Sequence, residues 1–414
     1  MRSNALLHRR QTPAGTLFLG CVLLGCVFVS GCAEGDRRAA DIAVDTLESG
    51  TILVHNGAAG VWSEGEAWRT VEVVRIGSAD AADPLVLFGD VWDVTLDALG
   101  RIYVLDRQPN EVRVFDETGR HVRTLGREGG GPGEFRNPIR LAWGPDHNLW
   151  VLDEGNARYS VFDTAGNFRD SHSRRIGGWG YAMQWIFDET GRLYEPGYAV
   201  DPATGEYGRV YIRHSVAEDV VPTDTFGLVR YDASASSHTL RSEGGLTVVG
   251  IPFAPRLTWH FDGVDGLWFA VNDAFRLYHS SLAGDTSRIV ERETEPIPVG
   301  EADRQAIRER FASFGEPAVN QIIARVPAMK PAFETFVVDD RGYLWVVRTS
   351  GTGQLRSVRG VVFDVFDPDG RYLGAVQADV GTYPPPRIIG DRMVGVVRDE
   401  LDVPYIVLHR IEGR

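Results

Sequence analysis

The sequence predicts an all-β fold, a six-bladed β-propeller with a short helical insertion, which follows an N-terminal lipoprotein signal peptide. Three observations support this prediction: a repeated turn-and-strand pattern, an apolar N-terminal run that ends at a cysteine, and a mature chain without further cysteines. A chain of 414 residues would ordinarily contain two or three domains. A repeat fold can be larger, because each unit packs only against its neighbours.

Residues 1–31 have the features of a bacterial lipoprotein signal peptide. A basic start precedes the apolar run 16–29, which is too short to span a bilayer as a helix. The run leads into Val-Ser-Gly-Cys, the lipobox pattern, in which cleavage precedes Cys32 and its thiol receives a lipid. We therefore expect an exported, membrane-anchored protein with a tether and lead-in over residues 32–67. By analogy with bacterial lipoproteins, which this segment resembles, Ala33 after the cysteine is compatible with the outer membrane, facing the periplasm or the surface. An ordinary secretory signal with an incidental cysteine is the alternative.

Cysteine content and charge exclude several kinds of chemistry. All three cysteines (Cys21, Cys26 and Cys32) lie in or at the end of the signal, so the mature domain has no disulfide, thiolate metal site or cysteine nucleophile. The net charge is −14, from 57 acidic and 43 basic residues. Nucleic acid is therefore not an expected partner, because phosphate binding requires a positively charged surface.

A turn followed by two alternating strands occurs twice at the same spacing, over residues 97–120 and 149–166. One common offset relates three pairs of residues: Asp106 and Asp153, Phe115 and Phe162, and Gly119 and Gly166. A period of about 40 to 50 residues is typical of propeller blades. The Asp and Gly residues suit tight hairpin turns, and the period-2 alternation suits strands.

Four weaker copies begin near residues 188, 262, 339 and 390, which makes six units over residues 68–412. The strand 70–76 precedes the first complete unit and lacks a hairpin partner of its own. We expect it to complete the last blade beside residues 405–409, because this pairing closes the ring and removes an open sheet edge.

Two stretches interrupt the period. The span between the third and fourth turns contains strand-like runs at 210–213 and 246–249. The span between the fourth and fifth predicts a surface helix over 301–311 and a second over 317–326, and together they form a helical insertion at about residues 300–326. Insertions of this kind lie on one face of a repeat fold, often the binding face.

The segment Gly-Gly-Gly-Pro-Gly-Glu-Phe-Arg-Asn-Pro at 129–138 resembles the NHL-repeat signature, closely for the first two units and partly elsewhere. The chain from 68 to 412 also resembles the bacterial family of six-bladed β-propeller lipoproteins, through residues 253–256, 266–268 and 390–392 and the helix before Pro331. The resemblance implies an NHL/TolB-like propeller. Such propellers are mostly binding platforms and in a minority lyases or lactonases, so the resemblance does not decide the chemistry.

No catalytic constellation is found in the sequence. It contains no His-Glu-x-x-His motif and no Gly-x-Ser-x-Gly motif. Only His260 is expected near an inner strand, and we interpret it as an ordinary, partly exposed histidine. Asp367-Pro368-Asp369-Gly370 resembles the start of a calcium loop but matches the repeated hairpin turn better. Asp106 and Asp153 are expected to accept backbone hydrogen bonds at turns.

Propellers usually bind ligands at one end of the central channel, where the innermost strands begin. The candidate ligand-binding residues there are Asp90, Trp92, Asn137, Arg140, Tyr181, Arg256, Lys330 and Arg387. Arg256 is notable in so acidic a protein, because its guanidinium fork can hold a carboxylate or a sugar hydroxyl. The structural alternative is an ion pair between Arg256 and Asp90 across the channel.

Two functional hypotheses follow. The first is a monomeric, lipid-anchored binding or scaffolding module without catalytic residues, metal or other cofactor, whose ligand is a protein, a small molecule or a carbohydrate. The second is a propeller hydrolase, lactonase or lyase with a metal ion such as calcium in the channel. The second requires several Asp, Glu and Asn side chains that converge on one point. Asp90 and Asn137 are suitable for this, whereas the tyrosine, arginine and alanine expected at the other strand starts are not.

Overall fold

The computed structural model describes residues 41–63, 65–78, 83–174, 186–200, 207–217, 219–227, 233–242, 245–264, 266–282, 284–349 and 360–414. The predicted signal peptide, Cys32, the start of the tether and Tyr181 lie outside these ranges. Residues 39–414 belong to one compact unit. In the described part of the chain, no helix is long and apolar enough to cross a membrane.

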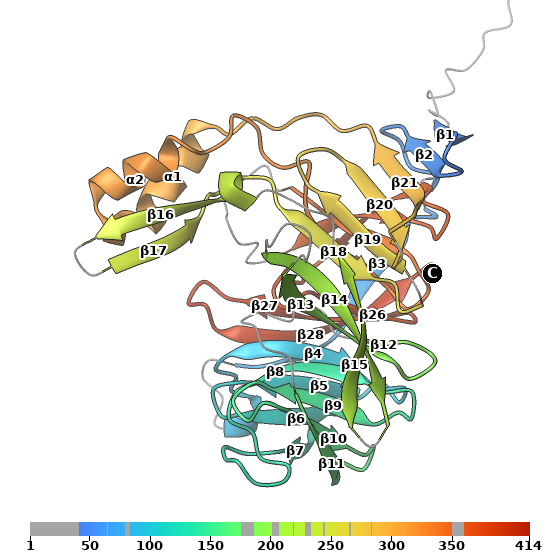
Figure 1. Cartoon of the computed structure of the whole chain (residues 1–414), viewed down its shortest axis with the longest axis vertical. Coiled ribbons are helices and arrows are strands. Elements are labelled where there is room, and N and C mark those ends of the chain that lie inside the picture. Colours follow the sequence, from blue (N-terminus) through green and yellow to red (C-terminus); the bar gives the residue numbers. More distant parts are fainter. Residues whose placement is uncertain are drawn as a thin grey trace, which may run out of the picture. The chain divides into compact units, whose positions relative to one another are not determined.

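The compact unit is a mostly β, six-bladed propeller (Figure 1), and each blade contains a four-stranded antiparallel sheet. Blade 1 consists of β4 (Val91–Leu96), β5 (Ile102–Asp106), β6 (Glu111–Phe115) and β7 (His121–Leu125). Blade 2 consists of β8 (Pro138–Trp143), β9 (Leu149–Asp153), β10 (Arg158–Phe162) and β11 (Phe168–Ser173). Blade 3 consists of β12 (Ile186–Phe187), β13 (Leu193–Val200), β14 (Tyr207–Val216) and β15 (Val220–Gly227).

The second half of the ring has the same plan. Blade 4 contains β18 (Leu257–Phe261), β19 (Gly266–Val271), β20 (Arg276–Ser281) and β21 (Thr286–Arg292). Blade 5 contains β22 (Phe333–Val338), β23 (Leu344–Arg348), β24 (Val361–Phe366) and β25 (Tyr372–Ala378). Blade 6 contains β26 (Arg387–Ile389), β27 (Arg392–Arg398), β28 (Pro404–Glu412) and β3 (Arg69–Ile76).

Ring closure follows the prediction from the sequence. Strand β3 pairs antiparallel with β28, with Val74 opposite Leu408 and Ile76 opposite Ile406. The N-terminal strand therefore completes the last blade, and no strand edge is left open between the first and last units.

The aspartate at the turn between the first two strands of a blade explains why the repeat is so regular. In blade 1, Asp97 Oδ1 accepts hydrogen bonds from the backbone N–H groups of Leu99 at 3.0 Å and Arg101 at 2.9 Å. Gly100 between them has a φ of 79°, a left-handed conformation that favours glycine. Asp188 in blade 3 and Asp339 in blade 5 accept the same pair of backbone bonds.

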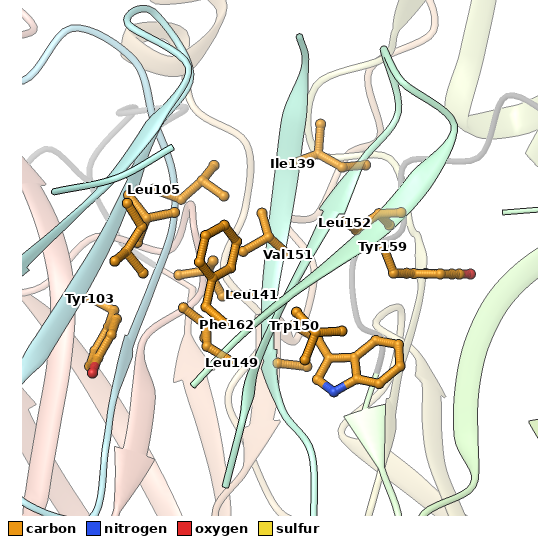
Figure 2. Packing of buried hydrophobic residues seen from close by; sticks show 14 of the residues in the cluster. Tyr103, Leu105, Ile139, Leu141, Leu149, Trp150, Val151, Leu152, Tyr159 and Phe162 are labelled. Atoms are coloured by element: carbon orange, nitrogen blue, oxygen red, sulfur yellow. The ribbon is translucent and has the colours of Figure 1, made fainter. Parts of the chain in front are cut away.

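The hydrophobic core lies between adjacent blades. Figure 2 shows side chains of blades 1 and 2 in contact, among them Leu105, Leu141, Val151 and Phe162. Because both faces of a blade are covered in this way, inner strands such as β5 and β9 are buried along their whole length, whereas the outer strands β7 and β11 are partly exposed. The stability of each blade therefore depends on its neighbours.

The lead-in pairs with the blades of the ring. Residues 42–56 form a hairpin of β1 (Ile42–Thr46) and β2 (Ile52–Asn56), and β2 pairs in parallel with β21 to extend blade 4 to six strands. The chain then crosses to blade 5, where the N–H groups of Val61 and Trp62 donate to Tyr372 and Leu373 at 3.1 and 2.8 Å. We call residues 42–76 the N-terminal staple, because they pair with blades 4, 5 and 6 in turn.

Asn56 connects this staple to blades 4 and 5. Its side chain is 0% exposed; Nδ2 donates to the carbonyls of Glu291 at 2.9 Å and Gly370 at 3.0 Å, and Oδ1 accepts from the N–H of Tyr372 at 2.7 Å. The sequence predicted a tether and lead-in over residues 32–67 without naming its partners. The structure adds that residues 42–56 form a hairpin and that β2 pairs with β21, which is far away in the sequence.

The two interruptions of the repeat fold together. A hairpin of β16 (Ser237–Ser242) and β17 (Gly245–Gly250) lies beside α1 (Glu301–Arg310) and α2 (Glu316–Ile323) (Figure 1). Both helices were predicted, with slightly different ends. Leu240 and Val249 of the hairpin share a core with Ile307 and Ile322 of the helices. We call these elements the insertion module. The described residues also contain three short 3₁₀ helices: η1 (Pro84–Val86), η2 (Ala233–Ser236) and η3 (Ala312–Phe314).

We predict that Asn56→Asp destabilises the protein by about 1–3 kcal/mol, because the carboxylate cannot donate to the carbonyls of Glu291 and Gly370. Urea unfolding of the purified protein measures this change. The control is the reverse isosteric change at an exposed position of the same hairpin, Asp45→Asn, which should have little effect. Equal midpoints for the wild type and Asn56→Asp would contradict the role of Asn56.

A second prediction concerns buried histidines. Desolvation lowers the pKa of His260 to about 4, and desolvation together with the charge of Arg174 lowers the pKa of His214 to about 4. The unfolded chain takes up these protons near pH 6.5, so between pH 6.5 and 4 it binds more protons than the native state. Stability should therefore fall as the pH falls through this window, with His260 contributing up to about 2 kcal/mol at pH 5.

Urea midpoints measured at pH 7.5 and pH 5 test this dependence. His260→Asn should reduce the difference between the two midpoints, whereas the same change at the exposed His55 should not. An unchanged pH dependence in His260→Asn would show that other groups cause the acid lability.

Candidate ligand pocket

A pocket of about 750 Å³ is formed by the insertion module and by blades 4 and 5. This volume lies within the usual range of small-molecule sites, about 300–1,000 Å³. The pocket is at the end of the ring where the innermost strands β18 and β22 begin. Its principal polar and aromatic lining residues are Phe253, Arg256, Arg310, Phe311, Glu334, Arg348 and Tyr383.

Asn272 positions two residues of this lining. Its side chain is 2% exposed; Oδ1 accepts from the N–H of Arg256 at 2.7 Å, and Nδ2 donates to the carbonyls of Phe333 at 2.9 Å and Glu334 at 3.3 Å. The backbone of Arg256 at the start of β18 is thereby tied to that of Glu334 in β22. One buried amide thus holds the wall of the pocket across the boundary between blades 4 and 5.

The repeat shows why an asparagine is needed there. Asp106 and Asp153 end the second strands of blades 1 and 2 and accept from the N–H groups that precede the innermost strands, those of Gly89 and Asp90 and of Arg136 and Asn137. This confirms their predicted role. Asn272 directly follows the second strand of blade 4, and its amide can both accept and donate. The change from Asp to Asn in the repeat was a signal that the sequence analysis missed.

Positive charge predominates in the described lining, where three arginines face one glutamate. Arg348 is held by Asp364, with Nε and Nη2 at 2.8 and 2.6 Å from the carboxylate. Asp364 is 0% exposed and also pairs with Arg292 at 2.8 Å, so two guanidinium groups share one carboxylate. The chain as a whole has a charge of −14, which makes this local excess of positive charge unusual.

Glu334 supplies the negative charge of the lining. Solvent reaches its carboxylate through the pocket, yet the surrounding protein atoms desolvate it and raise its pKa. The charges of Arg256 and Lys330 oppose this rise. A carboxyl group and a guanidinium group therefore lie near each other in a concave, partly dehydrated site, an arrangement common in functional sites.

Lys330 lies behind this wall and supports it. Its side chain is 1% exposed, its Nζ is 2.8 Å from Asp303 Oδ1, and it lies 5.1 Å from the centre of the Phe253 ring. Asp303 belongs to α1, so the ion pair attaches the insertion module to the segment that enters β22. Lys330 was predicted to contact ligand, whereas its partners give it a structural position.

The other described candidates belong to blades 1, 2 and 6, and their partners lie within a blade or in the next one. Asp90 Oδ2 accepts from Trp92 Nε1 and Arg107 Nε, both at 2.9 Å, so its ionic partner is Arg107 in place of the expected Arg256. Arg140 is buried and donates to the carbonyl of Trp92 at 2.9 Å.

Asn137 and Arg387 also have partners in the ring. The N–H of Asn137 donates to Asp153 at 2.9 Å, and Arg387 Nη2 lies 3.5 Å from Asp93 Oδ2 of blade 1. His260 lies on the innermost strand β18, as predicted, but is buried, with Nδ1 2.8 Å from the carbonyl of Phe261. Of the predicted ligand-binding residues that the structure describes, Arg256 alone lines the pocket.

The described residues contain no cluster of side chains suited to bind a metal ion. Among them, no three His, Cys, Asp or Glu side chains come together in a way that could hold a metal ion. Asp90, the carboxylate considered for a metal in the channel, pairs with Arg107 of its own blade at 2.7 Å.

Comparison with known proteins supports the fold. Residues 85–168, which include β4 to β10, match a sequence family described as a 6-bladed β-propeller. A search of curated proteins finds no match.

Several solved structures are similar at low identity. A candidate exported protein from Bacteroides fragilis has a TM-score of 0.47 and 11% identity, covering 87% of this chain and 99% of the other. A gluconolactonase from Xanthomonas campestris has a TM-score of 0.39 and 13% identity, covering 78% and 87%. A virginiamycin B lyase from Staphylococcus aureus has a TM-score of 0.40 and 9% identity, covering 83% and 99%. Likenesses this weak carry no argument, and the six-bladed β-propeller rests on the sequence-family match and on the sheets described above.

Proposed function

We propose that the protein is an exported, lipid-anchored β-propeller that binds a small anionic molecule in the pocket between the insertion module and blades 4 and 5. The observation that carries this proposal is the convergence of Arg256, Arg310 and Arg348 on one concave site in an acidic protein. Guanidinium groups bind carboxylates through two parallel hydrogen bonds, which gives both strength and orientation.

The remaining lining suits a ligand with an apolar or ring-shaped body. Phe253, Phe311 and Tyr383 offer flat apolar surfaces next to the arginines. Sites of this composition bury the body of a ligand and orient it through a few polar groups. We therefore expect a carboxylate-bearing small molecule rather than an extended polymer.

The site is also preorganised, which favours binding over a structural role. Asn272 fixes the backbone of Arg256 and Glu334, and Asp364 orients the guanidinium of Arg348. Groups that are already held in place lose less conformational entropy when a ligand arrives. The metal-dependent hydrolase or lyase has no comparable observation to favour it among the described residues.

Export and anchoring rest on the sequence alone. The basic start, the apolar run and the lipobox ending at Cys32 are the features that support them. The binding site would then face the periplasm or the cell surface, where the protein would act on a small molecule outside the cytoplasm.

We predict that carboxylates raise the thermal midpoint of the protein, because a ligand that binds only the native state stabilises it. Differential scanning fluorimetry with succinate, citrate and glucuronate, each beside its uncharged counterpart such as succinamide or glucose, provides the measurement. Isothermal titration should then show that Arg256→Ala weakens binding of the best carboxylate about tenfold or more, which corresponds to about 1.4 kcal/mol.

The matched control is Arg325→Ala, which removes an exposed arginine that follows α2 and lies outside the pocket. It should leave the affinity unchanged. If uncharged counterparts stabilise the protein equally, or if Arg256→Ala and Arg325→Ala behave alike, the pocket is not an anion site.

We also predict that Cys32 is required for membrane attachment. In a bacterial host the wild-type protein should fractionate with membranes and incorporate labelled fatty acid, and Cys32→Ser should do neither. Cys26→Ser, within the same signal segment, is the control and should behave like the wild type. Unlabelled wild-type protein in the soluble fraction would favour the ordinary secretory signal instead.

A further inference from the structure

In blades 1 and 3, the turn aspartate receives a guanidinium from its own turn. In blade 1, Asp97 Oδ2 accepts from Arg101 Nε, four residues later, at 2.6 Å and from the Tyr103 hydroxyl at 3.2 Å. Blade 3 repeats the arrangement: Asp188 Oδ2 accepts from Arg192 Nε at 2.7 Å and from the Tyr194 hydroxyl at 3.2 Å. The guanidinium thus comes from four positions after the aspartate, and the aromatic donor from six.

Blade 5 keeps the aspartate and the aromatic residue but lacks the arginine. Asp339 Oδ2 accepts from Trp345 Nε1 at 2.7 Å, and the position of the arginine is occupied by Tyr343. The missing guanidinium comes from Arg414, whose Nη2 is 2.6 Å from Asp339 Oδ2. The side chains of Arg414 and Asp339 are 1% and 0% exposed, so the interaction is fully buried.

Aromatic rings surround this guanidinium. Its central carbon lies 5.2 Å from the ring centres of Trp68 and Tyr343 and 6.0 Å from that of Trp345. Trp62 packs against Trp68, with 5.1 Å between the ring centres. A cation among electron-rich rings gains electrostatic stabilisation when water is excluded, and Asp339 balances its charge.

We propose that Trp68, Tyr343, Trp345 and Asp339, with Trp62 packed against Trp68, form a guanidinium-binding cage, which Arg414 occupies in this chain and which accepts a free guanidinium compound when that side chain is removed. The cage recognises a planar cation. Nε and Nη1 of Arg414 have no hydrogen-bond partner among the described residues, so recognition relies on the flat faces of the guanidinium and on one carboxylate. An ammonium group is more strongly hydrated and has no flat face, so it should be a poorer occupant.

Occupation of the cage has a consequence for the fold. The cage joins residues from three parts of the chain. Trp62 and Trp68 belong to the N-terminal staple, and Tyr343 and Trp345 belong to blade 5. Arg414 follows β28 of blade 6. The guanidinium therefore holds three separate segments together at the place where the staple passes from blade 5 to blade 6. An empty cage leaves Asp339 buried without a cation, which is costly.

Chemical rescue of Arg414→Ala in the full chain tests this proposal. We expect the variant to lose several degrees of thermal midpoint. Ethylguanidinium at millimolar concentrations should restore at least half of the loss, whereas ethylammonium at the same concentration should not. Arg414→Lys keeps the charge without the planar group and should remain close to Arg414→Ala.

The double variant Arg414→Ala, Asp339→Asn is the control, because it removes the carboxylate that pairs with the cation. Ethylguanidinium should not rescue it. Tryptophan fluorescence gives a second readout, since ethylguanidinium should change the emission of Arg414→Ala and leave that of the wild type unchanged. An unaltered midpoint in Arg414→Ala, equal rescue by ethylammonium, or rescue of the double variant would overturn the proposal.

Discussion

Closure of the ring by β3 and β28 is the constraint on which the remaining structure depends, because a propeller sheet buries both of its faces only when a neighbour lies on each side. The N-terminal segment supplies this closure and also forms backbone hydrogen bonds with two other blades. Before it reaches blade 6 it extends blade 4 through β2 and pairs with the edge of blade 5. Half of the ring is therefore connected by one continuous segment.

Buried amides and carboxylates then determine how neighbouring blades are positioned. Asp106 and Asp153 connect strands within a blade, whereas Asn272 and Asn56 use both halves of an amide to connect two blades. Asn272 lies at the base of the arginine-lined pocket, so the same bond that joins blades 4 and 5 also positions the residues we propose for ligand binding. Stability and the proposed function are linked at this boundary, because losing the Asn272 hydrogen bonds between blades 4 and 5 would displace Arg256 relative to Glu334.

The fold was largely predictable and the site was not. Turn aspartates, left-handed glycines and alternating strands are local features, so six units, the closing strand and both helices could be predicted from neighbouring residues. The staple could not, because Ile52–Asn56 pairs with a strand more than two hundred residues away. Arg256 was found because it precedes an innermost strand. Glu334 and Arg348 lie on paired strands of blade 5, and Arg310 joins them only because the insertion module packs beside blades 4 and 5. The aspartates and arginines predicted for the channel instead bond within the ring.

The central claim is that the pocket beside Arg256 is an anion-binding site. A crystal structure of the protein grown with the carboxylate that stabilises it most is the most direct test. The account predicts the ligand's carboxylate within hydrogen-bond distance of the Arg256 guanidinium, with its body against Phe253 or Phe311 of the insertion module. A ligand bound in the channel near Asp90 and Arg140, with the pocket beside Arg256 unchanged, would contradict it.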